Sequence, residues 1–245
     1  MKTQKILVLW STLRSTSTAF ETMMRQRGDF LVLHEPFSLY YYRSQERKSD
    51  RYAEYSRDSN FNFETIFHSL IEKAKNQPLF IKDMAYYIVD KANPEFLNHF
   101  ERTFLIRDPA KSLPSLFSLW PDFSLIEAGY AQMYQLFELT KAFLGKNPPV
   151  IDSDDLVQKP EATVKCYCDA VKIQFIPKAL KWETKVPQVP KWVENWHTNL
   201  QSTQGFEQRT KDFQVGIEDN DYLKKAYDYC FPYYQKMSEY RLRIQ

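Results

Sequence analysis

Arg14 lies among serine and threonine side chains that directly follow an apolar segment. The hydroxyl residues around it are Ser11, Thr12, Ser15, Thr16, Ser17 and Thr18. A guanidinium group presents a planar fork of N–H donors that matches a tetrahedral oxyanion, and hydroxyls add further donors. The segment therefore indicates a phosphate or sulfate site. Because serine and threonine also cap ordinary helices, a capped helix beside a solvated arginine is equally open here.

Three more groups of polar residues follow apolar segments of strand length. His34 and Glu35 follow one segment, Lys82 and Asp83 the next, and Arg107 a third. A carboxylate or an imidazole can take a proton from a hydroxyl, so Glu35 is predicted to be a general base and His34 the alternative base. An ion pair that orients a neighbour, or a turn cap, is the competing role for Glu35. Arg107 could likewise only cap its strand.

The elements that must position these groups alternate along the chain. Apolar strand segments lie at 6–10, 31–33, 79–81, 103–106 and 149–151. Helical patterns lie at 19–27, 66–75, 94–100 and 124–144, after residue 160, and from residue 222. This alternation predicts an α/β fold with a parallel sheet of about five strands flanked by helices. Because such sheets bind ligands at the carboxyl ends of their strands, the polar groups are expected to meet at one edge.

Composition limits the class of protein. A chain of 245 residues that is 43% hydrophobic and 26% charged is predicted to form one globular domain over residues 1–245. A net charge of +2 argues against a nucleic-acid partner, so a few placed cations must hold any anion. The sequence has neither a bilayer-length apolar run nor a signal-peptide core, which predicts a cytoplasmic protein with no membrane partner. Three cysteines favour neither disulfides nor a zinc site.

Aromatic residues are abundant, with 16 tyrosines and 18 phenylalanines. They are frequent in residues 38–63, which are expected to cross the ligand edge, and beyond residue 175, where an aromatic-rich C-terminal wrap is expected. These parts, with Phe37 next to the predicted base, are predicted to contact the acceptor. Dense packing of the core is the alternative explanation for the aromatic content.

The segment around Arg14 resembles the 5′-phosphosulfate loop of sulfotransferases that use 3′-phosphoadenylyl sulfate (PAPS). That loop is usually a proline, then lysine or arginine, then Ser-Gly-Ser/Thr-Thr. Arg14 takes the basic position, whereas Leu13 stands for the proline and Thr16 for the glycine. The remaining hydroxyl positions are filled by Ser15, Ser17 and Thr18. The resemblance implies that Arg14 and residues 15–18 bind the donor.

A second, separate resemblance lies in FLIRDPAKSLPSLF, which is similar to the 3′-phosphate motif of the same family. It implies that Arg107 and Ser115 bind the 3′-phosphate, with Ser112 as an alternative hydroxyl. The segment IDSDDLVQKPEATV also resembles a structural strand-to-helix motif of the family. HEPF, residues 34–37, resembles a Glu-Pro segment of bacterial and carbohydrate-type sulfotransferases in which the glutamate can act as base.

Two family features are altered in this chain. Animal cytosolic sulfotransferases carry a catalytic histidine near the position of Lys82 and Asp83, and no histidine occurs here, so that role is not transferred. Lys82 and Asp83 are instead predicted to contact the acceptor or the sulfuryl group, with a salt bridge between Lys82 and Asp83 or a neighbour as the alternative. The C-terminal Arg-Lys-Gly element is missing, and Arg209 or Lys211 is the predicted substitute.

The resemblance implies the P-loop NTPase-like sulfotransferase fold and transfer of a sulfuryl group from PAPS to a small alcohol or phenol. The product would be 3′-phosphoadenosine 5′-phosphate (PAP), and no metal is expected. A sulfotransferase-like binding protein without turnover is one alternative, motivated by Leu13 and Thr16. A P-loop small-molecule kinase is the other, although the glycines of its Walker A pattern are absent. Which alcohol or phenol is the acceptor, and the oligomeric state, are not predicted.

Overall fold

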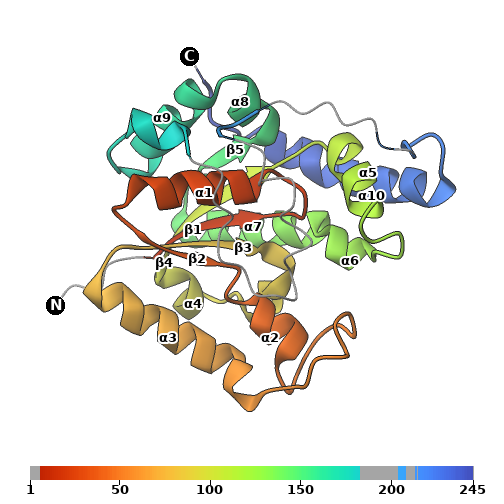
Figure 1. Ribbon diagram of the computed structural model, residues 1–245, viewed down its shortest axis with the longest axis horizontal. Coiled ribbons are helices and arrows are strands. Elements are labelled where there is room, and N and C mark those ends of the chain that lie inside the picture. Colours follow the sequence, from red (N-terminus) through yellow and green to blue (C-terminus); the bar gives the residue numbers. More distant parts are fainter. Residues whose placement is uncertain (1–5, 183–203, 208–212, 214, 245) are drawn as a thin grey trace.

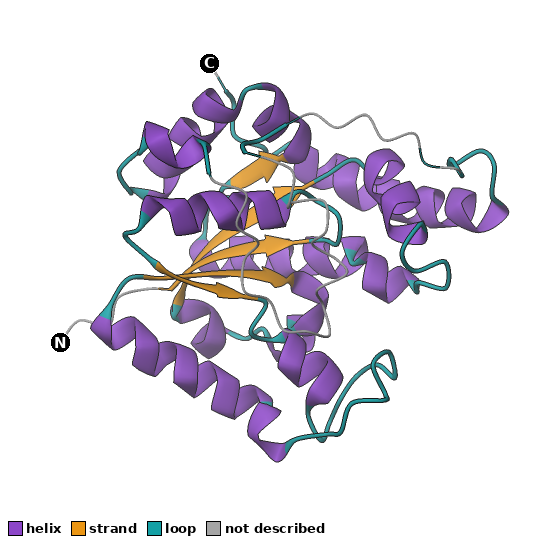
Figure 2. Ribbon diagram, viewed as in Figure 1, coloured by secondary structure: helices purple, strands orange, loops and turns teal. Residues whose placement is uncertain are grey.

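The computed structural model describes residues 6–182, 204–207, 213 and 215–244. Within them five parallel strands form one sheet in the order β2-β3-β1-β4-β5. The strands are β1 (Ile6–Ser11), β2 (Leu31–His34), β3 (Leu79–Met84), β4 (Phe100–Ile106) and β5 (Val150–Asp152). Their arrows point toward the same edge in Figure 2. The predicted α/β fold with a parallel sheet of about five strands is confirmed.

Both faces of the sheet are covered, which explains why β1 is apolar at successive positions. Val8 and Trp10 pack into the hydrophobic core on one face, and Leu7 and Leu9 pack into the core on the other. Side chains alternate between the two faces of a strand, so a strand buried on both sides needs a continuous apolar run. The central strand therefore anchors two separate helical layers.

One layer packs on the face that carries Leu7 and Leu9. It contains α1 (Ser17–Arg27), α8 (Ser153–Gln158), α9 (Pro160–Val171) and the 3₁₀ helix η4 (Pro177–Leu180). The Phe20 ring of α1 lies 6.2 Å from Phe80 of β3 and 4.9 Å from Tyr167 of α9, measured between ring centroids. Helix α1 is thus packed directly against both the sheet and its neighbouring helix.

The other layer is larger. It contains α3 (Phe63–Asn76), α4 (Pro94–Asn98), α7 (Tyr130–Leu144) and α10 (Asp221–Ser238). Shorter elements are α2 (Ser38–Arg43), α5 (Pro109–Phe117), α6 (Leu125–Ala128), and the 3₁₀ helices η1 (Ser59–Phe61), η2 (Ala85–Tyr87) and η3 (Val89–Lys91). Figure 1 shows α1, α8 and α9 on one side of the sheet and α3 and α4 on the other. Within the described parts of the chain, no helix is both long and apolar enough to cross a membrane.

Two helix predictions are corrected by the structure. The helix expected at 124–144 is divided into α6 and α7 by Gly129, whose φ of +80° is left-handed. A Cβ atom there would lie 3.2 Å from Cδ1 of Tyr86, so close packing also favours glycine. The helix expected at 94–100 ends at Asn98, because the His99 carbonyl accepts the Ile6 N–H at 3.0 Å and Phe100 starts β4.

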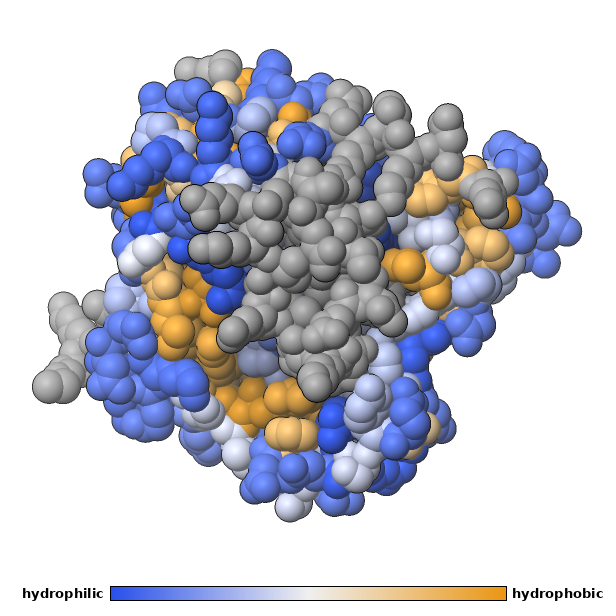
Figure 3. All heavy atoms as spheres, viewed as in Figure 1, coloured by the Kyte–Doolittle hydropathy of each residue, from blue (hydrophilic) through white to orange (hydrophobic). Residues whose placement is uncertain are grey.

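Hydrophilic side chains cover much of the outer helices in the view of Figure 3, with hydrophobic patches beside them. Several charged side chains are nevertheless buried, among them Glu21, Glu35, Lys82, Asp83 and Arg102, which are each exposed by less than a tenth. Burying a charge is costly unless it is paired. The surroundings of these residues must therefore compensate their charges. All of those named except Arg102 belong to the site described next.

Candidate active site

The loop between β1 and α1 has an unusual backbone. Arg14 and Thr16 have φ values of 61° and 65°, both in the left-handed region. This conformation disfavours residues with a Cβ atom, and such strain is concentrated at functional sites. Thr16 stands where the resembling loop has glycine, and the structure shows that this position has the backbone that glycine adopts most readily.

Thr16 is the N-cap residue of α1, but its side chain does not cap the helix. Its hydroxyl oxygen instead lies 2.8 Å from Oγ of Ser153, at the start of α8. The first N–H groups of a helix have no intrahelical acceptor and form the positive end of its dipole. The start of α1 is thus a place where an anion could accept hydrogen bonds from these N–H groups, and binding there stays a prediction.

Arg14 and Arg107, which are far apart in sequence, meet at this loop. Nε of Arg14 donates to Oγ of Ser115 at 2.9 Å, and Nη1 of Arg107 donates to the Arg14 carbonyl at 2.6 Å. The segments that resemble the two donor-binding motifs are therefore joined in one place. Ser115, rather than Ser112, contacts an arginine side chain directly.

The two guanidinium groups affect each other electrostatically. Burial, and then the positive charge of Arg107, lower the pKa of Arg14 to about 10. Burial also lowers the pKa of Arg107, whose Nε is buried with no hydrogen-bond partner among the described residues. An anion with several oxygens would relieve both the repulsion and the missing hydrogen bond.

Ser112 has a different role. Its hydroxyl lies 2.6 Å from the Tyr130 hydroxyl, which also donates to the carbonyl of Arg107 at 2.8 Å. Asp108 accepts the Ala110 N–H at 2.8 Å and caps α5. These contacts fix the backbone next to Arg107 at the end of β4, and binding of the 3′-phosphate by Ser112 stays a prediction.

A second cluster of charges lies at the ends of β2 and β3. His34 and Lys82 are register partners in neighbouring strands, so their side chains share one face of the sheet. Nζ of the fully buried Lys82 contacts Oε1 of Glu35 and lies 3.8 Å from Oε2 of Glu21. His34 lies between the same carboxylates, with Nδ1 2.6 Å from Glu21 Oε2 and Nε2 3.5 Å from Glu35 Oε1.

Glu35 occupies a tight turn directly after β2. Its φ of 42° is left-handed, its N–H donates to the Lys82 carbonyl at 2.8 Å, and the Tyr87 hydroxyl donates to Oε2 at 3.1 Å. The structure thus brings together the predicted base, the alternative base His34 and Lys82. It also shows that Glu35 takes part in ion pairs, so its action as a base stays a prediction.

Asp83 and Phe37 lie on the opposite side of β3 from this cluster. Asp83 accepts the N–H groups of Phe37 and Met84, each at 2.9 Å. Burial, and then the charge of Glu35, raise the pKa of Asp83 well above its usual value. Phe37 is fully buried and its ring stacks 5.5 Å from Phe63. The structure therefore places Asp83 and Phe37 inside the protein, where they fix the turn, and Lys82 pairs with Glu35 rather than with Asp83.

Sequence reasoning missed three members of the site: Glu21, Ser153 and Tyr87. Glu21 could have been identified from the sequence, because the helical pattern places it beside Phe20 and Met24, on the side of α1 that must face the sheet. Ser153 and Tyr87 could not have been identified in this way, because only the fold brings them close to site residues that are distant in sequence. Arg209 and Lys211, the predicted substitutes for the C-terminal element, lie outside the described residues.

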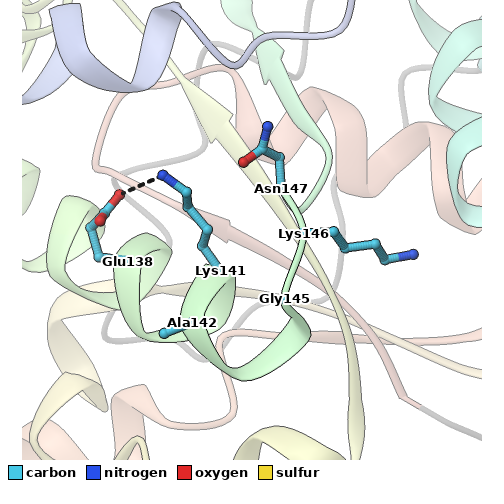
Figure 4. A pocket seen from close by; sticks show the side chains of 6 residues that line it. All are labelled: Glu138, Lys141, Ala142, Gly145, Lys146 and Asn147. Carbon is cyan, nitrogen blue, oxygen red and sulfur yellow. Dashed lines mark ion pairs between the residues drawn. The ribbon is translucent and has the colours of Figure 1, made fainter.

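A separate hollow lies at the other edge of the sheet (Figure 4). It is lined by Glu138, Lys141, Ala142, Gly145, Lys146 and Asn147. These residues lie at the C-terminal end of α7 and in the loop before the amino end of β5. The polar groups of the candidate site instead follow the carboxyl ends of the strands. The hollow shares no residue with the candidate site.

Comparison with known proteins gives one family and several relatives. The family described as "Sulfotransferase domain" matches residues 4–240. "Branched-chain-amino-acid aminotransferase-like protein 2" from Arabidopsis thaliana is 28% identical over 204 residues, which are 82% of this chain and 36% of that protein. The corresponding protein 1 is 25% identical over 208 residues, with 84% and 37% covered. The chain thus spans little more than a third of these curated relatives.

The solved structures similar to this chain include two sulfotransferase domains. The "Sulfotransferase Domain from the Curacin Biosynthetic Pathway" has a TM-score of 0.45 at 14% identity, covering 98% of this chain and 99% of its own. The "Sulfotransferase Domain from the Synechococcus PCC 7002 Olefin Synthase" has a TM-score of 0.47 at 14% identity, covering 92% and 95%.

Proposed function

Since this chain belongs to the sulfotransferase domain family, we propose that it moves a sulfuryl group from PAPS to a hydroxyl of a small alcohol or phenol. The observation that carries the proposal is the meeting of Arg14, Arg107 and Ser115 at the start of α1. Two neighbouring guanidinium groups with lowered pKa values suit a ligand that carries more than one anionic group. The predicted cytoplasmic location is part of the same proposal.

Different residues would bind the two ends of the donor. Arg14 and the N-terminal turn of α1 would hold the 5′-phosphosulfate. Arg107 and Ser115 would hold the 3′-phosphate, and the buried Nε of Arg107 offers a donor for one of its oxygens. Because Ser115 already contacts Arg14, binding at one end would also fix the other end.

The chemistry is in-line displacement, in which positioning and charge neutralisation supply most of the catalysis. PAPS, when bound, supplies a sulfuryl group attached to a phosphate leaving group. Arg14 would neutralise the charge that grows on the departing phosphate. Glu35, with His34 as the alternative, would take the proton from the acceptor hydroxyl, and Lys82 would balance the carboxylate charge.

The aromatic side chains around Glu35 support the proposal that the acceptor is small and partly apolar. Tyr87 donates to Glu35, and the Tyr41 and Tyr86 rings lie 5.2 Å and 4.5 Å from the Tyr87 ring. The hydroxyls of Tyr42 and Tyr86 lie 2.9 Å apart. Such a cluster lowers the local polarity and keeps water from the carboxylate.

Thermal unfolding with candidate ligands tests the donor site. At 100 times its Kd, PAP should stabilise the folded chain by about 2.7 kcal/mol and raise Tm by roughly 5 to 10 °C. Adenosine 5′-phosphosulfate lacks the 3′-phosphate and should give a clearly smaller shift. NAD, at the same concentration, serves as the control nucleotide.

Three results would contradict the proposal. Equal shifts with PAP and adenosine 5′-phosphosulfate would show that the 3′-phosphate is not recognised. Stabilisation by ATP with magnesium, but not by PAP, would favour a kinase. A PAP shift without sulfuryl transfer to any member of a broad panel of alcohols and phenols would favour a binding protein.

A further inference from the structure

Glu21 is a fully buried carboxylate in the middle of α1 with cations on both of its oxygens. Oε1 accepts from Arg25, at 3.1 Å from Nε and 2.6 Å from Nη2. Oε2 lies 2.6 Å from His34 Nδ1 and 3.8 Å from Lys82 Nζ. The helix that begins at the anion loop is thus tied by one side chain to the ends of β2 and β3.

The contact between Glu21 and His34 determines where the imidazole carries its proton. Burial acts to raise the pKa of Glu21, but His34, Lys82 and Arg25 together hold that pKa well below its usual value. An ionised carboxylate only accepts hydrogen bonds, so His34 Nδ1 must be the donor. In a neutral imidazole the lone pair then lies on Nε2.

His34 Nε2 faces the second carboxylate of the cluster. It lies 3.5 Å from Oε1 of Glu35, the oxygen that also contacts Lys82. The side chain of Glu35 is 10% exposed, whereas that of Glu21 is 0% exposed, so Glu35 is the carboxylate nearer to an entering acceptor. The path from Glu21 through His34 to Glu35 therefore runs from the interior toward the ligand edge.

The charges of the cluster suit the uptake of one proton. With His34 neutral, the carboxylates of Glu21 and Glu35 are balanced by Lys82 and Arg25. A proton gained by the imidazole would be flanked by both carboxylates. The remaining groups that face the cluster are Tyr87, which donates to Glu35, and Asp83 on the other side of β3, where burial and then the charge of Glu35 raise the pKa of the carboxyl group.

We propose that Glu21 is a positioning residue for proton transfer: it holds His34 with Nδ1 protonated, so that the His34–Glu35 pair takes the proton of the acceptor hydroxyl. This inference rests on the proposed function. The acceptor oxygen forms a bond to sulfur, and the bond from sulfur to the phosphate oxygen breaks with its electron pair leaving on the phosphate. The released proton stays on the His34–Glu35 pair until product leaves.

Glu21→Gln tests the proposal in sulfuryl transfer. The change should lower kcat about 10- to 100-fold while KM for PAPS changes less than about twofold, since the donor site is untouched. Loss of the negative charge beside His34 should also move the acid limb of the pH–rate profile. Glu21→Asp, which keeps the charge, should recover part of kcat. An unchanged profile in Glu21→Gln would overturn the proposal.

Glu161→Gln is the matched control. It makes the same change from carboxylate to amide at an exposed position in the first turn of α9, outside the cluster. We expect kcat within about twofold of the parent protein and the same acid limb. If Glu161→Gln reproduced the effect of Glu21→Gln, a general charge effect would explain both results and the inference would fail.

Nuclear magnetic resonance of ¹⁵N-histidine gives a readout that needs no turnover and no Glu21 variant. The His34 signals, identified by their loss in His34→Gln, should show a protonated Nδ1 and an unprotonated Nε2 in the neutral form of the ring. A protonated Nε2 in the neutral ring would overturn the inference even if PAPS is used. The expected tautomer in a protein that neither binds PAP nor transfers sulfuryl groups would support the positioning by Glu21 and contradict only the proposed function.

Discussion

At the scale of single residues, the main feature of the candidate site is the close approach of two positively charged side chains, Arg14 and Arg107. Like charges are brought together only where something repays the cost, and Arg14 is also held in a left-handed backbone with φ 61°. The repulsion and the strain fall on the same residue, which contacts Ser115 and whose carbonyl binds Arg107. An oxyanion ligand would offset both costs.

Arg14→Ala should reduce PAPS-dependent transfer by about 10² to 10³-fold, the usual cost of removing one donor to a developing anion. Tm without ligand should stay the same or rise, because one of two neighbouring positive charges is removed. Initial rates and thermal unfolding check the two parts.

Lys146→Ala is the control for loss of one positive charge. Lys146 is exposed at the hollow of Figure 4, at the opposite edge of the sheet, and its removal should leave the rate within about twofold. Equal losses in the two variants would point to a general charge effect and against a specific role of Arg14.

At the scale of elements, the chain between α2 and α3 is fastened to the region before α7. Arg51 donates to both carboxylate oxygens of Glu127 at 2.6 and 3.0 Å and to Asp122 at 3.1 Å. Its guanidinium lies 4.0 Å from the centre of the Trp120 ring. Although burial opposes it, the Glu127 carboxylate raises the pKa of Arg51. One side chain therefore joins two segments that follow β2 and β4.

Arg51→Ala should lower the free energy of unfolding by about 2 kcal/mol, because it leaves the carboxylate of Glu127 buried without its arginine. Hydrogen exchange in residues 44–62 should become faster than in the parent protein. Arg51→Ala with Glu127→Gln should recover part of the loss, since the uncompensated charge is then gone.

Lys75→Ala offers a comparison at an exposed ion pair. Lys75 and Glu72 have side chains that are 48% and 67% exposed, so their contact should contribute almost nothing. If exchange in residues 44–62 were as slow in Arg51→Ala as in Lys75→Ala, Arg51 would not hold the segment.

At the scale of the whole molecule, the two helical layers depend on the central strand β1. Leu9 is fully buried between register partners Lys82 and Thr103, on the face that packs against α1. The same face carries the ends of β2 and β3, where the charged cluster forms. Packing of this layer and placement of the cluster therefore depend on each other.

Leu9→Ala should lower the free energy of unfolding by about 2 to 5 kcal/mol, the range for removing a buried leucine side chain and leaving a cavity. Leu139→Ala, at a site on α7 that is 38% exposed, should change it by less than about 1 kcal/mol. Urea unfolding monitored by circular dichroism measures both. If both variants lowered the free energy of unfolding by a similarly small amount, the two helical layers would not depend on β1 as described.

Much of the fold was decided by local sequence signals. An apolar run such as 6–10, followed by Arg14 and hydroxyl residues, contains the strand, the turn and the candidate anion site within a few residues. The same holds for Arg107 after β4 and for Glu35 after β2. Because parallel strands place their carboxyl ends at one edge, the alternation of strands and helices was enough to predict which polar groups share that edge.

The tertiary structure alone decided which of these groups touch. Lys82 and Asp83 are adjacent in sequence, yet they point to opposite faces of β3, so only Lys82 joins Glu35. Glu21 became part of the site through His34 and Lys82, two residues on other strands. A buried charge is stabilised by whatever lies within a few ångströms in space, and distance along the chain carries little information about those neighbours.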